Sequence, residues 1–254
     1  MSNERNMIYL CLAHMSDEGL EQKYIKEAFD TNWVVPLGPN VNAFEDNLKQ
    51  FVGKDQQGRE KEVVALSAGT AAVHLALIAC GVKPGDEVCV QSFTFCASSH
   101  PITYLGATPV FIDSERDTWN MDPELLEKAI LDRIEKTGKK PKAIIPVALY
   151  GMPYDCERIM AVAEKYDIPV IEDAAEGFGS KFKGHMLGTF GKFGIAFLAV
   201  FIDFTAQVDA VRFLALSCID NIRCFLVRDV VKDVAFGKHN QNVIYFLARK
   251  PATD

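Results

Sequence analysis

The chain has 254 residues, of which 49% are hydrophobic and 24% are charged, so it can bury a sizeable core. A formal net charge of -7 argues against a general binder of nucleic acids or anionic membranes, because such partners select basic surfaces. The sequence contains no long uncharged apolar run that would predict a transmembrane helix, and its first residues lack the basic-then-apolar order of a signal peptide. The seven cysteines form no Cys-x-x-Cys pair, which is typical of reduced thiols. We expect a soluble cytoplasmic protein.

The first part of the chain, residues 1–194, alternates between short apolar runs and longer amphipathic stretches. Two helices are expected first, at 18–30 and 41–52, outside a sheet. Strands are then expected at 63–66, 87–90, 109–112, 143–147 and 169–171, with helices at 70–80, 123–136 and 156–166. Such alternation predicts βαβ units. The expected fold is therefore an α/β three-layer sandwich around a mostly parallel sheet.

The second part, residues 195–254, has a different composition. It holds one glycine, one proline and no glutamate, although the whole chain has 17 glycines and 11 prolines. A folded domain needs turn residues between its elements, and this part has few. We therefore predict a domain over residues 1–194 and an atypical tail of unknown structure over 195–254.

The first candidate motif is Ser67-Ala68-Gly69-Thr70, between an expected strand and an expected helix. Backbone N–H groups at a helix N-terminus, a glycine and a hydroxyl can hold a phosphate. Turns of this kind also serve packing in many α/β proteins. The motif by itself leaves both interpretations open.

The second candidate is Asp173, directly after the apolar run Pro169-Val170-Ile171. Open α/β sheets bind ligands outside the carboxyl ends of their strands, where an aspartate can keep a pyridine nitrogen protonated. Taken alone, the residue is better explained as the N-cap of a following helix. The third candidate is Phe95, which stacks on a flat cofactor or fills the core. The five histidines lack metal-ligand spacing, and we expect no metal site; they are His14, His74, His100, His185 and His239.

The order and spacing of the three motifs along the chain, with Gly69 first, Phe95 next and Asp173 last, resemble those of the DegT/DnrJ/EryC1/StrS family of sugar aminotransferases. Further matching segments are Leu37-Gly38-Pro39-Asn40-Val41, Val82-Lys83-Pro84-Gly85-Asp86, Leu149-Tyr150-Gly151-Met152-Pro153 and Gly188-Thr189-Phe190-Gly191. The resemblance covers roughly residues 7–194. It implies the large domain of a pyridoxal-phosphate (PLP) transferase, truncated, with the C-terminal small domain absent.

The resemblance also assigns roles to matching residues. Gly69 and Thr70 would hold the phosphate of PLP, Phe95 would stack on its ring, and Asp173 would pair with the ring nitrogen. Glu176 lies where members of the family carry Gln or Glu close to the cofactor. The implied reaction transfers an amino group from glutamate to a nucleotide-linked 4-keto-6-deoxy sugar for surface polysaccharide or glycan assembly, in a homodimer.

One residue of the family pattern is missing. The Schiff-base lysine of the family is expected at Ile202, Lys192 lies too early, and the next lysine downstream is Lys232. Some relatives carry histidine there and act as dehydratases, which Ile202 does not support. The alternative function is therefore a catalytically inactive family member that binds PLP weakly.

We interpret the tail, as a hypothesis, as the product of a shifted reading frame or a badly joined gene model. The abrupt change of composition motivates this hypothesis, and a gene sequence with one uninterrupted frame would contradict it. In a third interpretation the tail replaces the missing part, and Lys232 or Lys238 reaches the PLP carbonyl carbon.

Overall fold

The computed structural model describes residues 16–35, 37–196 and 199–202. The chain forms two compact units, divided between Phe44 and Glu45, so the predicted domain over 1–194 contains a division that the sequence did not indicate. The two expected N-terminal helices are confirmed as α1 (Leu20–Asp30) and α2 (Pro39–Val52). The unit division falls within α2.

Seven strands of the second unit lie side by side in the order β3-β2-β4-β5-β8-β9-β1. Their bounds are Glu62–Ala65 (β1), Glu87–Gln91 (β2), Thr108–Ile112 (β3), Ala143–Ile145 (β4), Ile171–Asp173 (β5), Phe193–Ala196 (β8) and Ala199–Ile202 (β9). Two parallel bridges, Ile144 with Val170 and Val147 with Asp173, join β4 to β5. Only β9 among these strands runs antiparallel to its neighbours. The prediction of a mostly parallel sheet is confirmed.

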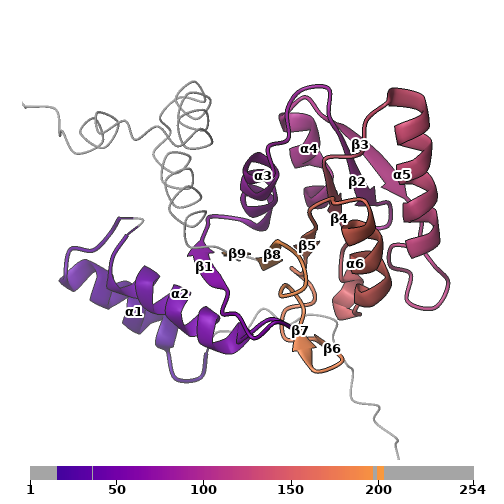
Figure 1. The fold of residues 1–254 in the computed structure, drawn as a ribbon. Helices are drawn as coiled ribbons and strands as arrows, with labels where there is room; N and C mark the ends of the chain where they lie inside the picture. Colours follow the sequence, from indigo (N-terminus) through magenta and orange to yellow (C-terminus); the bar gives the residue numbers. More distant parts are fainter. Residues whose placement is uncertain (1–15, 36, 197–198, 203–254) are drawn as a thin grey trace, which may run out of the picture. The chain divides into compact units, whose positions relative to one another are not determined.

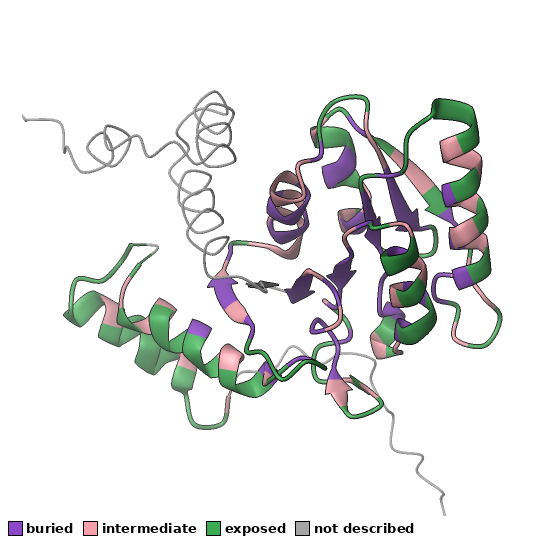
Figure 2. Ribbon diagram, viewed as in Figure 1, coloured by how far each residue is buried: buried purple, intermediate pink, exposed green. Residues whose placement is uncertain are grey.

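Helices cover both faces of this sheet, as Figure 1 shows. One face carries α3 (Gly69–Ala79) and α4 (His100–Tyr104), and the other carries α5 (Pro123–Thr137) and α6 (Cys156–Lys165). Along β2 the side chains alternate between the two cores, with Val88 and Val90 on the α3 side and Cys89 on the α5 side. The central strands β2, β4, β5 and β8 are buried, while the edge strand β3 is partly exposed and α5 and α6 expose their outer faces (Figure 2). The three-layer α/β fold is confirmed.

Short elements escaped the sequence analysis because they contain too few residues to show a period. They are the 3-10 helices η1 (Cys96–Ser98) and η2 (Leu149–Gly151), and the hairpin of β6 (Lys181–Phe182) and β7 (His185–Met186). The start of α5 agrees with its sequence signal: Asp122 caps the helix by accepting from the N–H groups of Glu124 and Leu125, and Pro123 follows.

The composition changes after Gly194, but the sheet does not end there. Strand β8 runs through Gly194, and β9 lies beyond it and pairs with both β8 and β1. The described part of the predicted tail therefore belongs to the sheet. The tail residues from 203 onward lie outside the described residues.

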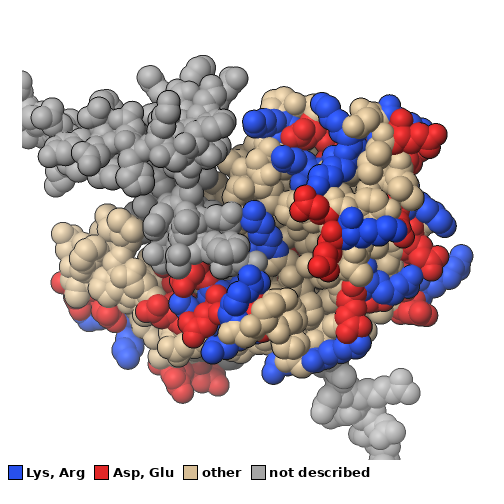
Figure 3. Space-filling model, in the orientation of Figure 1, with Lys and Arg blue, Asp and Glu red and all other residues tan. Residues whose placement is uncertain are grey.

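On the face shown in Figure 3, basic and acidic side chains are interspersed. Ion pairs at the surface include Lys165 with Glu127 and Arg158 with Glu124. Among the described residues, no helix combines the length and the apolar composition that crossing a membrane requires.

Candidate functional site

The three predicted motifs leave the sheet at one edge. Strands β1, β2 and β5 run in the same direction, so their carboxyl ends point to the same side of the sheet. The segment 67–70 follows β1, the segment 92–95 follows β2, and Asp173 is the last residue of β5. Helix α3 crosses from β1 to β2 and contacts η1 and β5. The carboxyl edge therefore gathers residues that lie far apart in the sequence.

Asp173 is buried, with 7% of its surface exposed. Its Oδ2 accepts a hydrogen bond from the Ser98 hydroxyl at 2.6 Å, and its Oδ1 accepts from the Ala175 N–H at 3.3 Å. Burial raises the pKa of the Asp173 carboxyl above its ordinary value, and these two hydrogen bonds oppose the rise only in part. No helix follows Asp173 within the described residues, so the N-cap interpretation is wrong.

Gly69 and Thr70 are the first two residues of α3. The preceding residue, Ala68, is extended and offers no side-chain cap to the helix. The amide groups of the first turn of a helix have no partner within that helix. Together with the helix dipole, these groups suit an anion such as a phosphate.

Phe95 and Glu176 both lie at the surface. Phe95 is 73% exposed, so the core interpretation of this residue is wrong. The Glu176 Oε2 accepts a hydrogen bond from the Tyr150 N–H at 2.5 Å. The Glu176 charge acts on Asp173 and contributes to the raised pKa of that carboxyl.

Ser98 is a site residue that the sequence analysis missed. Besides its bond to Asp173, the Ser98 Oγ lies 2.9 Å from the Thr94 Oγ1. It is buried within η1, a single turn of 3-10 helix. Only the packing of η1 against the end of β5, 75 residues away, reveals its partner, so no local signal could have identified it.

A buried amide pair supports the neighbouring loops. The Gln91 Nε2 donates to the Phe93 carbonyl and to the Asn120 Oδ1, at 2.9 and 3.3 Å. The Gln91 Oε1 accepts from the Met121 N–H, and Asn120 bridges to the loop after β4 by accepting from the Leu149 N–H. A polar residue at the end of the apolar run of β2 was the available sequence signal.

This scaffold holds three exposed aromatic rings close together. The Phe93 centroid lies 6.3 Å from that of Trp119 and 6.4 Å from that of Tyr150, both edge-on. Trp119 and Tyr150 have positive φ values of 65° and 51°, which residues with a Cβ seldom adopt. Exposed residues with a strained backbone, such as Trp119 and Tyr150, occur at binding sites more often than elsewhere.

The position of the expected Schiff-base lysine lies away from this edge. The backbone of Ile202 pairs with Phe193 and Glu62 at the amino ends of β8 and β1. Asp173 is instead level with Ile195, which pairs with Val200. Ile202 is therefore two residues, or roughly 7 Å along the strands, from the level of Asp173. Lys232 and Lys238 lie outside the described residues.

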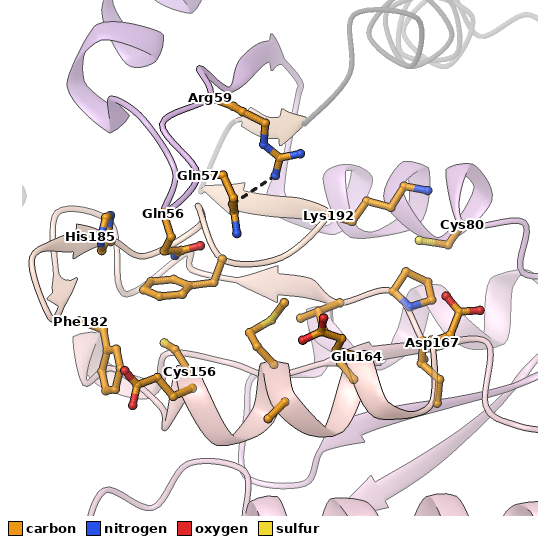
Figure 4. A pocket seen from close by; sticks show the side chains of 18 of the residues that line it. Gln56, Gln57, Arg59, Cys80, Cys156, Glu164, Asp167, Phe182, His185 and Lys192 are labelled. Atoms are coloured by element: carbon orange, nitrogen blue, oxygen red, sulfur yellow. Dashed lines mark hydrogen bonds between the residues drawn. The ribbon is translucent and has the colours of Figure 1, made fainter.

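The cavity in Figure 4 is not this site. It has a volume of about 1230 Å3 and lies at the amino ends of β4, β5 and β8, where Lys142, Val170 and Lys192 line it. None of the predicted cofactor-binding residues lines it. Apolar side chains such as Phe182 and Met160 form part of its wall.

The histidines lie in different surroundings. His74 contacts the edge of the Tyr104 ring, and burial lowers its pKa. His100 is exposed, and His185 lies edge-on to Phe190. Among the described residues, no three His, Cys, Asp or Glu side chains gather as a metal site would require. His14 and His239 lie outside the described residues.

Comparison with known proteins identifies the family. The family model for the DegT/DnrJ/EryC1/StrS aminotransferases matches residues 16–199. The chain belongs to this aminotransferase family. EpsN of Bacillus subtilis (strain 168), assigned to the aminotransferases that depend on pyridoxal phosphate, is 52% identical over 188 residues. That alignment covers 74% of this chain and 46% of EpsN.

Two further members are similar in sequence or in fold. GDP-perosamine synthase of Escherichia coli O157:H7 is 40% identical over 185 residues, covering 73% of this chain and 47% of the synthase. A crystal structure of a DegT DnrJ EryC1 StrS aminotransferase from Brucella abortus matches with a TM-score of 0.66 and 33% identity, over 78% of this chain and 58% of that one. The chain thus spans about half the length of these family members.

Proposed function

We propose that this chain forms the PLP-binding face of an aminotransferase that acts on nucleotide-linked sugars. The observation that carries this proposal is the buried Asp173 carboxyl, which is held by Ser98 at the same edge of the sheet as the other residues that the family pattern assigns. A carboxylate there suits a protonated pyridine nitrogen, because that cation would supply the charged partner that Asp173 lacks among the described residues.

The chemical types of the residues present suit the ring nitrogen, the phosphate and the ring of the cofactor. Asp173 would hold the ring nitrogen, and Ser98 orients the Asp173 carboxylate through its 2.6 Å hydrogen bond. The amino end of α3 at Gly69 and Thr70 would hold the phosphate. The exposed Phe95 ring is free to stack on a flat cofactor, and Glu176 would lie beside it. PLP, when bound, supplies an electron sink for amino-group transfer.

The substrates follow from the family. We propose a nucleotide-linked 4-keto-6-deoxy sugar as acceptor and glutamate as amino donor, in surface polysaccharide or glycan assembly. The name of the 40% identical relative, GDP-perosamine synthase, supports a nucleotide-linked sugar. We also propose that the working form is a homodimer, as the resemblance implies.

A second function is favoured by one specific observation. Position 202 is an isoleucine and lies at the amino edge of the sheet, so the described residues do not place a lysine where relatives need one. We therefore keep the alternative that the chain binds the cofactor without catalysing transfer. Removal of a covalent catalyst lowers the rate by many orders of magnitude.

The two functions share a cofactor site, which can be tested without the lysine. Pyridoxamine 5'-phosphate carries its own amine and needs no covalent bond to the protein. We expect saturable binding of pyridoxamine 5'-phosphate to the full chain, followed by its fluorescence. Asp173→Asn should weaken this binding about ten- to a hundredfold, the scale of a hydrogen bond to a charged group.

The matched control is Asp155→Asn, which changes the N-cap of α6 and leaves the carboxyl edge intact. It should bind pyridoxamine 5'-phosphate as the unmodified chain does. The absence of saturable binding to the unmodified chain would overturn both functions. Binding accompanied by amino transfer from glutamate to a nucleotide-linked keto sugar would favour the first function, and binding alone the second.

A further inference from the structure

The neighbour of Asp173 on β5, Glu172, is fully buried among backbone donors on the other side of the strand. Its Oε2 accepts from the Gly188 N–H at 3.0 Å. Its Oε1 accepts from the N–H groups of Phe190 and Gly191, both at 2.6 Å. All three donors belong to the segment 188–191, which joins the β6–β7 hairpin to β8. We call this segment the glycine turn.

A buried lysine holds the same turn from another direction. Lys61, just before β1, is 1% exposed, and its Nζ donates to the Gly191 carbonyl at 2.9 Å. Gly191 is thus held at its N–H by Glu172 and at its carbonyl by Lys61. Burial raises the pKa of Glu172, while the hydrogen bonds from the turn and the Lys61 charge oppose that rise. The three N–H donors and the ammonium group all favour the ionised carboxylate.

The glycine turn packs so closely against neighbouring backbone that a residue with a Cβ does not fit at Gly191 or at Gly194. A Cβ at Gly191 would lie 2.7 Å from the Val170 carbonyl oxygen. A Cβ at Gly194 would lie 2.0 Å from the Gly188 carbonyl oxygen. The backbone of the turn therefore lies directly against the start of β5 and against β8.

This turn determines where β8 begins and hence how it aligns with β5. Phe193 lies opposite Ile171, and Ile195 lies opposite Asp173. The Ala174 N–H donates to the Ile195 carbonyl at 2.9 Å, directly beyond Asp173. A shift of the turn would move β8 and the backbone that carries Asp173.

We propose that Lys61 and Glu172 are positioning residues: through their hydrogen bonds to the backbone of the glycine turn they hold the turn, align β8 with β5, and so place Asp173 for the cofactor. The proposal rests on the proposed function in one respect, namely that Asp173 binds the ring nitrogen. Buried charged groups contribute little net stability compared with apolar groups of similar size, and fixing one register is the best-attested use of such groups.

The test compares local order with cofactor affinity. In Glu172→Gln, one oxygen that accepts from the turn is replaced by an amide donor, and the carboxylate charge is lost. We expect faster amide hydrogen exchange in a peptide covering residues 186–195. We also expect binding of pyridoxamine 5'-phosphate to weaken by roughly tenfold or more, the scale observed when the outer support of a binding group is removed.

The control is Asp55→Asn, another buried carboxylate with a similar set of partners. Asp55 accepts from the N–H groups of Gln57 and Arg59 and from the Arg59 side chain, and none of these residues belongs to the glycine turn. It should lower the thermal midpoint without changing exchange at 186–195 or the affinity for pyridoxamine 5'-phosphate.

Two further variants keep the test decisive if Glu172→Gln does not fold. Lys61→Arg keeps the charge and should retain slow exchange, whereas Lys61→Met should lose it. The double variant Lys61→Met with Glu172→Gln removes both buried charges. It should regain thermal stability but neither slow exchange nor affinity, since the turn still lacks its ionic partners.

The proposal is overturned if folded Glu172→Gln, or the double variant, shows unchanged exchange at 186–195, or if exchange rises while affinity stays the same. Failure of the proposed function looks different. In that case the unmodified chain does not bind pyridoxamine 5'-phosphate at all, and the exchange of the variants still reports whether Lys61 and Glu172 hold the turn.

Discussion

Two adjacent carboxylates of β5 lie on opposite sides of the same strand and differ in their partners. Glu172 meets three backbone N–H groups and the nearby charge of Lys61. Asp173 meets one hydroxyl and one long contact to a backbone N–H. Both are buried, so burial does not distinguish them. The number of hydrogen-bond donors distinguishes them. A carboxylate that accepts from several backbone N–H groups stabilises the fold, whereas one that can accept further hydrogen bonds can bind a ligand.

The largest effect is expected on the Glu172 side. Gly194→Ala places a Cβ 2.0 Å from the Gly188 carbonyl oxygen, and the nearest neighbouring atoms are all backbone atoms of Gly188. We expect a loss of more than about 4 kcal/mol in the free energy of unfolding, or no folded protein. Urea unfolding followed by circular dichroism measures it. Gly184→Ala, whose Cβ meets no atom within 4 Å at φ +89°, should lose only about 1–2 kcal/mol.

On the Asp173 side, removal of the carboxylate charge should stabilise the fold. Burial raises the pKa of Asp173, so ionising it opposes folding, and stability is lost as pH rises from the unfolded value of 3.8 through the folded value. Asp173→Asn should therefore raise the thermal midpoint at pH 7 by a few degrees. The gain should shrink toward acid pH and vanish below the unfolded value. A midpoint difference independent of pH would contradict this account.

A smaller gain is expected at the aromatic rings of the carboxyl edge. Tyr150 is 80% exposed and has φ 51°, a conformation that asparagine tolerates better than tyrosine. Tyr150→Asn should stabilise the chain by roughly 1 kcal/mol or less, because it relieves backbone strain and loses little buried surface. Denaturant midpoints measure the change. Tyr166→Asn is the comparison: Tyr166 has φ -101°, so no strain is relieved, and no gain is expected.

The smallest effect is expected at position 202. Ile202→Lys restores the residue type of the family, but the register keeps its backbone level with Ile171 and not with Asp173. We expect no covalent product when PLP and then borohydride are added, as judged by mass spectrometry of the lysine-containing peptides. A phosphopyridoxyl group on the new lysine would show that β9 can leave this register.

The sequence by itself determined most of the elements and the kind of site. Alternating apolar runs predicted the five strands from β1 to β5, and proline after Asp122 predicted the start of α5, because such signals lie within a few residues of one another. The motifs around Gly69, Phe95 and Asp173 were predicted at strand ends, where the structure has them.

Only the tertiary structure decided the partners of these residues. Ser98 and Asp173 are 75 residues apart, and Lys61 and Gly191 are 130 apart, so their hydrogen bonds depend on the order of strands in the sheet. The same holds for β9, whose antiparallel position between β1 and β8 moves Ile202 to the amino edge. A local sequence pattern predicts which helix or strand a segment can form. The residues that the segment contacts depend on the order in which all the strands pack around one core.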